Sequence, residues 1–152
     1  MSAKTRISFW LAICLLVLFI AVITTHNANP LVHQTAGIVM FTVVTIHVIL
    51  HWKWIKTVIK RRFLPVPRQT KVNFVYDTFL LCALTLTASS GLAISPTFRS
   101  GDAPDTLITL HHASAEMLSF GIAIHLILHR KWILHTIKQY LTDLIPAPSK
   151  SV

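Results

Sequence analysis

Residues 46–55 read IHVILHWKWI, and residues 124–133 read IHLILHRKWI, so one pattern occurs twice at an offset of 78 positions. Eight of the ten aligned positions are identical. Further matches at this offset are His33 with His111, Ile59 with Ile137 and Lys60 with Lys138. Three histidines of each copy thus align in register. This predicts two parallel repeats of one structural unit, at about 7–60 and 72–138.

The repeats lie in a chain dominated by apolar residues. Of its 152 residues, 53% are hydrophobic and only 12% are charged, whereas a soluble domain carries about 25% charged residues. About 20 apolar residues cross a bilayer, so this length accommodates four spans and no additional soluble domain. The composition therefore excludes an ordinary soluble globular protein, and also a disordered or fibrous chain. We expect one transmembrane domain over residues 1–152.

Four transmembrane helices are predicted from the apolar runs. The first is interpreted as a retained span, because it is longer than a signal-peptide core and no small-x-small cleavage site follows it. The second begins near Pro30, a residue favoured at a first helical position, with Asn29 as its cap. We expect the four spans at about 7–25, 30–56, 72–94 and 107–137. The predicted fold is an all-α, up-down-up-down four-helix transmembrane bundle.

The distribution of basic residues sets the expected orientation. Of the 14 Lys and Arg residues, only Arg99 falls on one side of the predicted topology. The positive-inside rule then places both termini in the cytoplasm, as in a multi-pass protein of an inner cell membrane. The net charge of +9 is therefore interpreted as a topology signal and as attraction to anionic membrane lipid. It does not indicate nucleic-acid binding.

Four histidines are expected to face the interior of the bundle at two levels. Ionisable residues inside a span are functional candidates. His33 and His47 are 14 positions apart. Steps of about 100° bring them within about 40° of one direction, roughly 21 Å apart along the axis. His111 and His125 repeat this spacing. With the second and fourth spans diagonally opposed, one pair lies near the outer surface and the other pair lies deeper, toward the cytoplasm.

Each level offers two imidazoles across an apolar gap, which fits a planar haem with both axial positions occupied by histidine. The chain contains no Cys-x-x-Cys-His sequence, which excludes covalent attachment of a c-type haem. The sequence therefore predicts two non-covalent b-type haems. The predicted ligands of the haem iron are His33 with His111, and His47 with His125.

Histidines 14 residues apart on two parallel helices resemble the dihaem core of the respiratory cytochrome b family. The motifs His-x-x-Leu-His-Trp-Lys-Trp and His-x-x-Leu-His-Arg-Lys-Trp are similar to small membrane domains that are often encoded beside FMN-binding electron-transfer proteins. The resemblance implies a dihaem cytochrome that moves electrons between a quinone or redox partner and an acceptor on the other face. The chain lacks the later helices that help to build quinone pockets in cytochrome b. Haem binding is thus implied more directly than quinol oxidation.

The resemblance leaves the partners open. A quinone, superoxide, a flavoprotein and a multihaem cytochrome are all candidates for donor or acceptor. The chain is accordingly interpreted either as a simple electron-transfer protein or as a quinone- or superoxide-linked oxidoreductase. A homo-oligomer is equally open.

A further histidine pair, His51 and His129, is also expected to face inward. These residues lie 18 positions from His33 and His111, which corresponds to five helical turns. They are either the true axial pair of the inner haem or residues at the cytoplasmic rim that bond haem propionates or a quinone head group. Candidates to neutralise propionates at this depth are Lys53, Arg130 and Lys131. Their charge predicts a higher potential for the inner haem than for the outer haem.

The rival interpretation is a His-lined membrane metal-binding or transport protein without haem. His47 with His51, and His125 with His129, have the i, i+4 spacing that suits Zn, Fe or Cu. No carboxylate is expected near them, in contrast to His-Glu-x-x-His sites. Asp77 and Glu116 are interpreted as proton relays or as capping or pairing residues. Close approach of a macrocycle or a neighbouring helix is expected at Gly37, Gly91 and Gly121.

Overall fold

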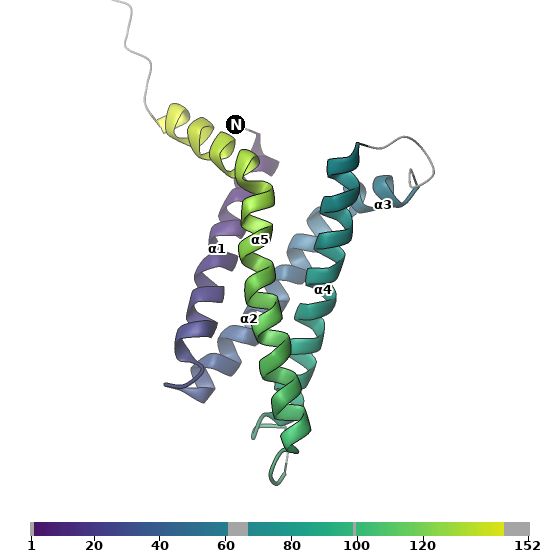
Figure 1. Cartoon of the computed structure of the whole chain (residues 1–152). Coiled ribbons are helices and arrows are strands. Elements are labelled where there is room, and N and C mark those ends of the chain that lie inside the picture. Colours follow the sequence, from purple (N-terminus) through teal and green to yellow (C-terminus); the bar gives the residue numbers. More distant parts are fainter. Residues whose placement is uncertain (1, 61–66, 99, 145–152) are drawn as a thin grey trace, which may run out of the picture.

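The computed structural model describes residues 2–60, 67–98 and 100–144, which form five helices and no strand. The helices are α1 (Ala3–Thr25), α2 (Pro30–Leu50), α3 (Trp52–Lys60), α4 (Arg68–Ile94) and α5 (Asp105–Leu144) (Figure 1). α1, α2, α4 and α5 are long and apolar enough to cross a membrane. The all-helical fold class and the four candidate spans are therefore confirmed. Arg61, Arg62, Arg99 and Lys150, which enter the charge count, lie outside the described residues.

Local hydrogen bonds explain where the first two helices begin. The Ser2 hydroxyl accepts a hydrogen bond from the Thr5 backbone N–H at 3.2 Å and caps α1. The Asn29 side chain accepts one from the Val32 N–H at 3.1 Å, and Pro30 is the first residue of α2. Side-chain caps satisfy amide groups that have no intrahelical partner. The predicted start of the second span is therefore confirmed, and α1 and α2 form an antiparallel pair (Figure 1).

The predicted continuation of the second span to Lys56 is wrong. α2 ends at Leu50, and its C-cap residue His51 leaves the helical conformation with φ −93° and ψ 5°. The His51 N–H is shared between the carbonyls of His47 and Val48, both at 3.2 Å. The chain then begins the separate nine-residue helix α3. One side of α3 buries Val58 while its basic residues stay exposed, which suits a helix lying at the membrane surface.

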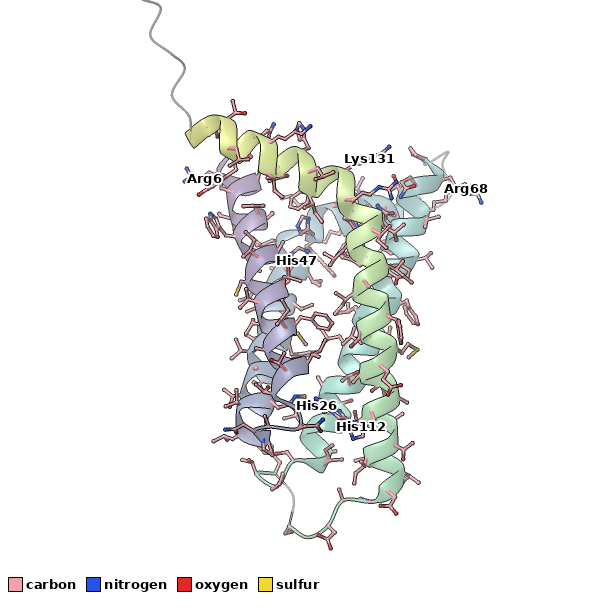
Figure 2. The ribbon with its side chains drawn as sticks, turned by 60° about the vertical axis from the view of Figure 1, so that its left-hand side comes forward. Arg6, His26, His47, Arg68, His112 and Lys131 are labelled. Carbon is pink, nitrogen blue, oxygen red and sulfur yellow. The ribbon has the colours of Figure 1, made fainter. Side chains whose placement is uncertain are left out.

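In the second repeat, the corresponding segment bends within one continuous helix, α5. α5 has 40 residues, or about 60 Å of helix, whereas the hydrocarbon core of a bilayer is about 30 Å thick. The helix bends near Lys131, and its C-terminal part crosses the top of the molecule (Figure 2). Arg6 and Arg68 lie at the same end as Lys131, whereas His26 and His112 lie at the opposite end (Figure 2).

An apolar cluster joins the helices at mid-height. α1 packs on α2, α4 packs on α5, and α2 also contacts α4. The buried members of the cluster are Met40, Ala83, Leu84 and Leu118, and α1 contributes Leu15, Leu18, Phe19 and Val22 around them. Met40 lies midway between His33 and His47 in sequence, and Leu118 lies midway between His111 and His125. The cluster therefore separates the two levels of histidines.

We predict that a larger side chain at Ala83 forces the packed helices apart. Ala83 is 4% exposed, and an inserted larger side chain in a close-packed core costs about 1–3 kcal/mol. Ala83→Leu should therefore lower the melting temperature of the protein in detergent. Cys82→Leu is the matched control, because Cys82 is exposed on the same helix. Equal melting temperatures for the two variants would contradict this packing.

Candidate functional site

The exposure of the nine histidines follows the helical phase expected from the sequence. Three of them are exposed: His26, His112 and His135. The six that were expected to face inward are all half-buried: His33, His47, His51, His111, His125 and His129. They belong to α2, its C-cap and α5, and they form two levels on either side of the apolar cluster. We name these levels after the expected orientation: the outer level is His33 and His111, and the inner level is His47, His51, His125 and His129.

At the outer level, the structure places the rings of His33 and His111 edge to face. Their ring centroids are 6.2 Å apart, with an interplanar angle of 87°. His33 Nδ1 lies 2.9 Å from the carbonyl oxygen of Val22. His111 Nδ1 lies 3.0 Å from the carbonyl oxygen of Thr87 and 3.3 Å from the hydroxyl oxygen of Ser90. The rings are therefore held by α1 and α4, the helices that pack beside their own.

These bonds determine which ring nitrogen remains available. A backbone carbonyl only accepts hydrogen bonds, so Nδ1 of His33 and Nδ1 of His111 each carry a proton and donate it. In a neutral imidazole the other nitrogen, Nε2, then has a free lone pair. Metal-ligating histidines usually donate their second nitrogen in this way, which fixes the tautomer and the ring orientation. Both outer histidines thus present Nε2 as a potential metal ligand.

Gly91 makes room for the His111 ring. A Cβ atom at this position would lie 2.9 Å from Cε1 and 3.3 Å from Nδ1 of His111. At Gly37, no atom of the described residues lies within 4 Å of the corresponding point. At Gly121 the neighbour is Leu80, whose Cδ2 would lie 2.5 Å away. Close approach is therefore confirmed for two of the three helical glycines, and the predicted approach is not seen at Gly37.

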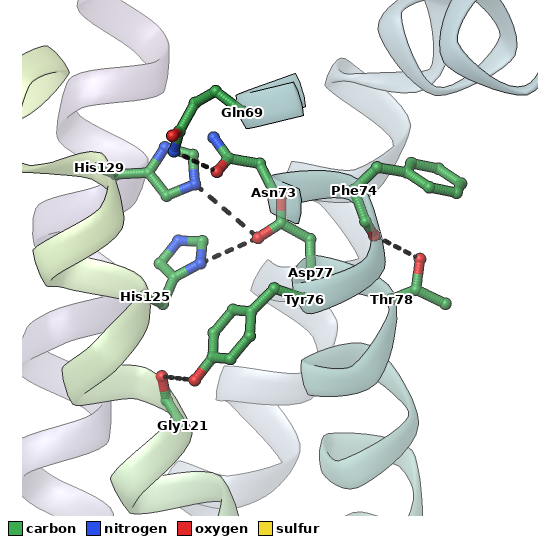
Figure 3. Close-up of polar contacts among 9 residues, drawn as sticks. All are labelled: Gln69, Asn73, Phe74, Tyr76, Asp77, Thr78, Gly121, His125 and His129. Carbon is green, nitrogen blue, oxygen red and sulfur yellow. Dashed lines mark hydrogen bonds and ion pairs between the residues drawn. The ribbon is translucent and has the colours of Figure 1, made fainter. Parts of the chain in front are cut away.

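At the inner level, Asp77 of α4 contacts two histidines of α5 (Figure 3). Its Oδ1 lies 3.0 Å from Nδ1 of His125 and 3.8 Å from Nε2 of His129. The rings of His125 and His129 are in contact, with centroids 4.5 Å apart and planes tilted by 39°. The expectation that no carboxylate lies near these histidines is therefore wrong. Asp77 is distant from them in sequence, and the packing of α4 on α5 brings it into contact.

The first repeat contributes His47 and His51 at the same level. Their ring centroids are 4.7 Å apart, and His47 lies within electrostatic range of Asp77 and His125. His47 Nδ1 is buried and has no hydrogen-bond partner among the described residues. A buried polar atom in a native structure usually has a partner. His47 therefore has donor or acceptor capacity that the described part of the chain does not satisfy.

The predicted rim residues Lys53, Arg130 and Lys131 are all exposed. Lys131 lies at the bend of α5, above the level of His47 (Figure 2). The nearby tryptophans Trp52, Trp54 and Trp132 are also exposed, as expected for side chains at a membrane interface. The structure therefore places these groups at the end of the molecule that also carries Arg6 and Arg68.

Several contacts of this site are invisible in the sequence. The carbonyls of Val22 and Thr87 have no signature, because every residue carries one. The bond from the Tyr76 hydroxyl to the Gly121 carbonyl, at 2.8 Å, likewise depends on how α4 packs on α5. For Asp77 the sequence did indicate a partner, because a carboxylate inside an apolar run needs one. Among the described residues, Asp77, His125 and His129 at the inner level have ligand atoms close enough together to hold a metal ion.

Comparison with family models, with curated proteins and with solved structures found no match for this chain. The functional assignment therefore depends on the two levels of histidines.

We predict that a methyl group at Gly91 disturbs the outer level. The His111 ring cannot move away without losing its bond to the Thr87 carbonyl, at 3.0 Å. Gly91→Ala should therefore destabilise the protein by about 1–3 kcal/mol, measured by unfolding in detergent. Gly37→Ala is the control, and it should be neutral or stabilising by up to about 1 kcal/mol. A larger loss of stability in Gly37→Ala than in Gly91→Ala would exclude this tight contact.

Proposed function

We propose that this chain is a membrane cytochrome that holds two b-type haems and transfers electrons between the two faces of the membrane. The observation that carries the proposal is the geometry of His33 and His111. A metal about 2 Å from one nitrogen of each of two opposed imidazoles puts the ring centroids roughly 6 Å apart. The observed separation is 6.2 Å. In both rings Nδ1 is occupied by a carbonyl, so Nε2 is the atom offered.

The repeat extends this proposal to the inner level. His47 and His125 are related to each other by the same offset of 78 positions that relates His33 to His111. His125 is oriented through its Nδ1, as the outer histidines are, but by the Asp77 carboxylate. The contacts of α1 with α2, of α4 with α5, and of α2 with α4 suit a bundle of two parallel hairpins in which α2 and α5 are diagonally opposed. We therefore propose that His47 and His125 would hold the inner haem.

In this proposal the haems supply the one-electron chemistry, and the protein binds, orients and insulates them. His33 and His111 would hold one haem, and His47 and His125 would hold the other. The apolar cluster around Met40 and Leu118 excludes water between the two levels. The exposed basic groups of Lys53, Arg130 and Lys131 are available to bond propionates at the inner level.

His129 is better suited to a supporting position than to an axial one. Its Nε2 lies 3.8 Å from Oδ1 of Asp77, the atom that already accepts a hydrogen bond from His125. In the first repeat the matching residue, His51, is the C-cap of α2 and has left the helical conformation. These positions support the assignment of His51 and His129 to places beside the inner haem, where they do not bind its iron. We propose that they bond a propionate or a quinone head group.

The orientation and the partners form part of the same proposal. The gathering of Arg6, Arg68 and Lys131 at one end supports placing that end, with both termini, in the cytoplasm (Figure 2). The inner haem then lies on the cytoplasmic side of the membrane. Because the chain has no soluble domain among its described residues, we propose that electrons enter from a quinol or flavoprotein and leave to a flavin- or haem-bearing carrier.

One observation favours a second candidate function, the binding of a divalent transition metal without haem. Ligand atoms of Asp77, His125 and His129 lie within 4.8 Å of one another, and carboxylate and imidazole are both zinc ligands. This candidate accounts for the inner level alone. It leaves the opposed rings of His33 and His111 without a purpose, so we place it second.

The ligand assignment predicts which variants lose haem. His33→Ala and His111→Ala should each lose one haem, and His47→Ala and His125→Ala should each lose the other. The absorption spectrum and the ratio of haem to protein in the purified variants measure this loss. His112→Ala and His135→Ala are matched controls on α5, because both side chains are exposed, and both should keep two haems. Haem loss from His51→Ala and His129→Ala, with retention in His47→Ala and His125→Ala, would reverse the inner assignment.

A further inference from the structure

Asp77 differs from every other carboxylate of the chain. The protein has only five acidic residues, and the other four are exposed: Asp102, Asp105, Glu116 and Asp143. The Asp77 side chain is only 32% exposed and lies in the apolar helix α4. An ionisable group inside a span is energetically unfavourable unless a partner stabilises it. The position of Asp77 therefore needs a reason beyond solubility.

The carboxylate of Asp77 is directed at the histidines of α5. Other polar groups of α4 near it have their own partners (Figure 3). Tyr76 donates to the carbonyl of Gly121 at 2.8 Å, and Asn73 accepts from Gln69 at 2.9 Å. Oδ1 of Asp77 accepts instead from Nδ1 of His125, at 3.0 Å. The contact is thus a specific pairing of a carboxylate with a proposed haem ligand.

Among the described residues, the outer level has no equivalent of this pairing. There Nδ1 of His33 and Nδ1 of His111 donate to neutral backbone carbonyls. A carboxylate partner raises the basicity of a ligating imidazole more than a carbonyl does, and a more basic ligand stabilises the oxidised, more positively charged iron. The two levels therefore differ in the electron-donating strength of one ligand.

We propose that Asp77 is a positioning residue which, through His125, gives the inner haem a lower potential than the outer haem. The inference rests on the proposed function and deepens it. A quinol on the cytoplasmic side would be oxidised to a quinone in two one-electron steps and would release its two protons on that side. Each electron would pass through the inner haem to the outer haem, and from there to a flavin- or haem-bearing acceptor on the outer face.

The basic residues near the inner level act in the opposite direction. Lys53, Arg130 and Lys131 would raise the inner potential, and from sequence alone they predict the reverse order. All three are exposed, so water and salt screen their charges. Asp77 is half-buried and in direct hydrogen-bond contact with the ligand. We therefore expect the contact of Asp77 to outweigh the more distant and better solvated cations.

The test is a potentiometric titration of the purified dihaem protein and four variants. His47→Ala identifies the inner transition, which should be the lower of the two. Asp77→Asn keeps the size of the side chain and removes its charge. It should raise the inner transition by the equivalent of a tenfold change in the redox equilibrium, about 59 mV for one electron. The outer transition should not move. Asp77→Glu retains a carboxylate and should keep the inner transition low.

Glu116→Gln is the matched control, because it makes the same carboxylate-to-amide change at an exposed position of α5. It should leave the inner transition unchanged. An unshifted inner transition in Asp77→Asn, or loss of the higher transition in His47→Ala, would overturn the inference while leaving the dihaem assignment intact. If Asp77→Asn fails to retain the inner haem, Asp77→Glu decides, because a carboxylate should restore both the haem and its low potential. A colourless wild-type protein would instead overturn the proposed function itself.

Discussion

An imidazole placed inside an apolar span has two ring nitrogens that need partners, and water is not available to supply them. In this chain the protein satisfies one nitrogen of the ring at three positions. Nδ1 is bound to the carbonyl of Val22 in His33, to the carbonyl of Thr87 in His111 and to Asp77 in His125. In the proposed dihaem protein, the other nitrogen of each ring would bind the haem iron. The orientation of the rings, the contacts between helices and the proposed chemistry all depend on this pattern.

The apolar cluster separates the two levels of histidines along the helix axes. Met40 and Leu118 occupy equivalent positions of the two repeats, and each lies midway between two histidines of its own helix. The same helices therefore carry polar groups at two heights and a dry layer between them. In the proposed dihaem protein, this apolar layer would lie between the two redox centres and exclude water there. A single zinc site at the inner level would need neither the outer pair nor the spacing.

The sequence was sufficient to predict the four spans, the cap at Asn29 and the inward phase of six histidines, because these depend on local periodicity. It was insufficient where the structure depends on contacts between helices that are distant in sequence. The break at His51 is one example, since the matching His129 continues within α5 although the two repeats are nearly identical there. The approach of Asp77 to His125 is another, because 48 residues separate the two in sequence. The space that Gly91 provides for His111 also arises only when α4 packs on α5.

The central claim is that the two levels of histidines hold two haems, and a pyridine haemochrome assay on the purified wild-type protein tests it most directly. The account predicts about two b-type haems per chain, both low-spin and six-coordinate because each has two histidine ligands. A colourless protein from haem-replete cells, carrying one zinc ion per chain, would contradict it. That result would assign the site to Asp77, His125 and His129 instead.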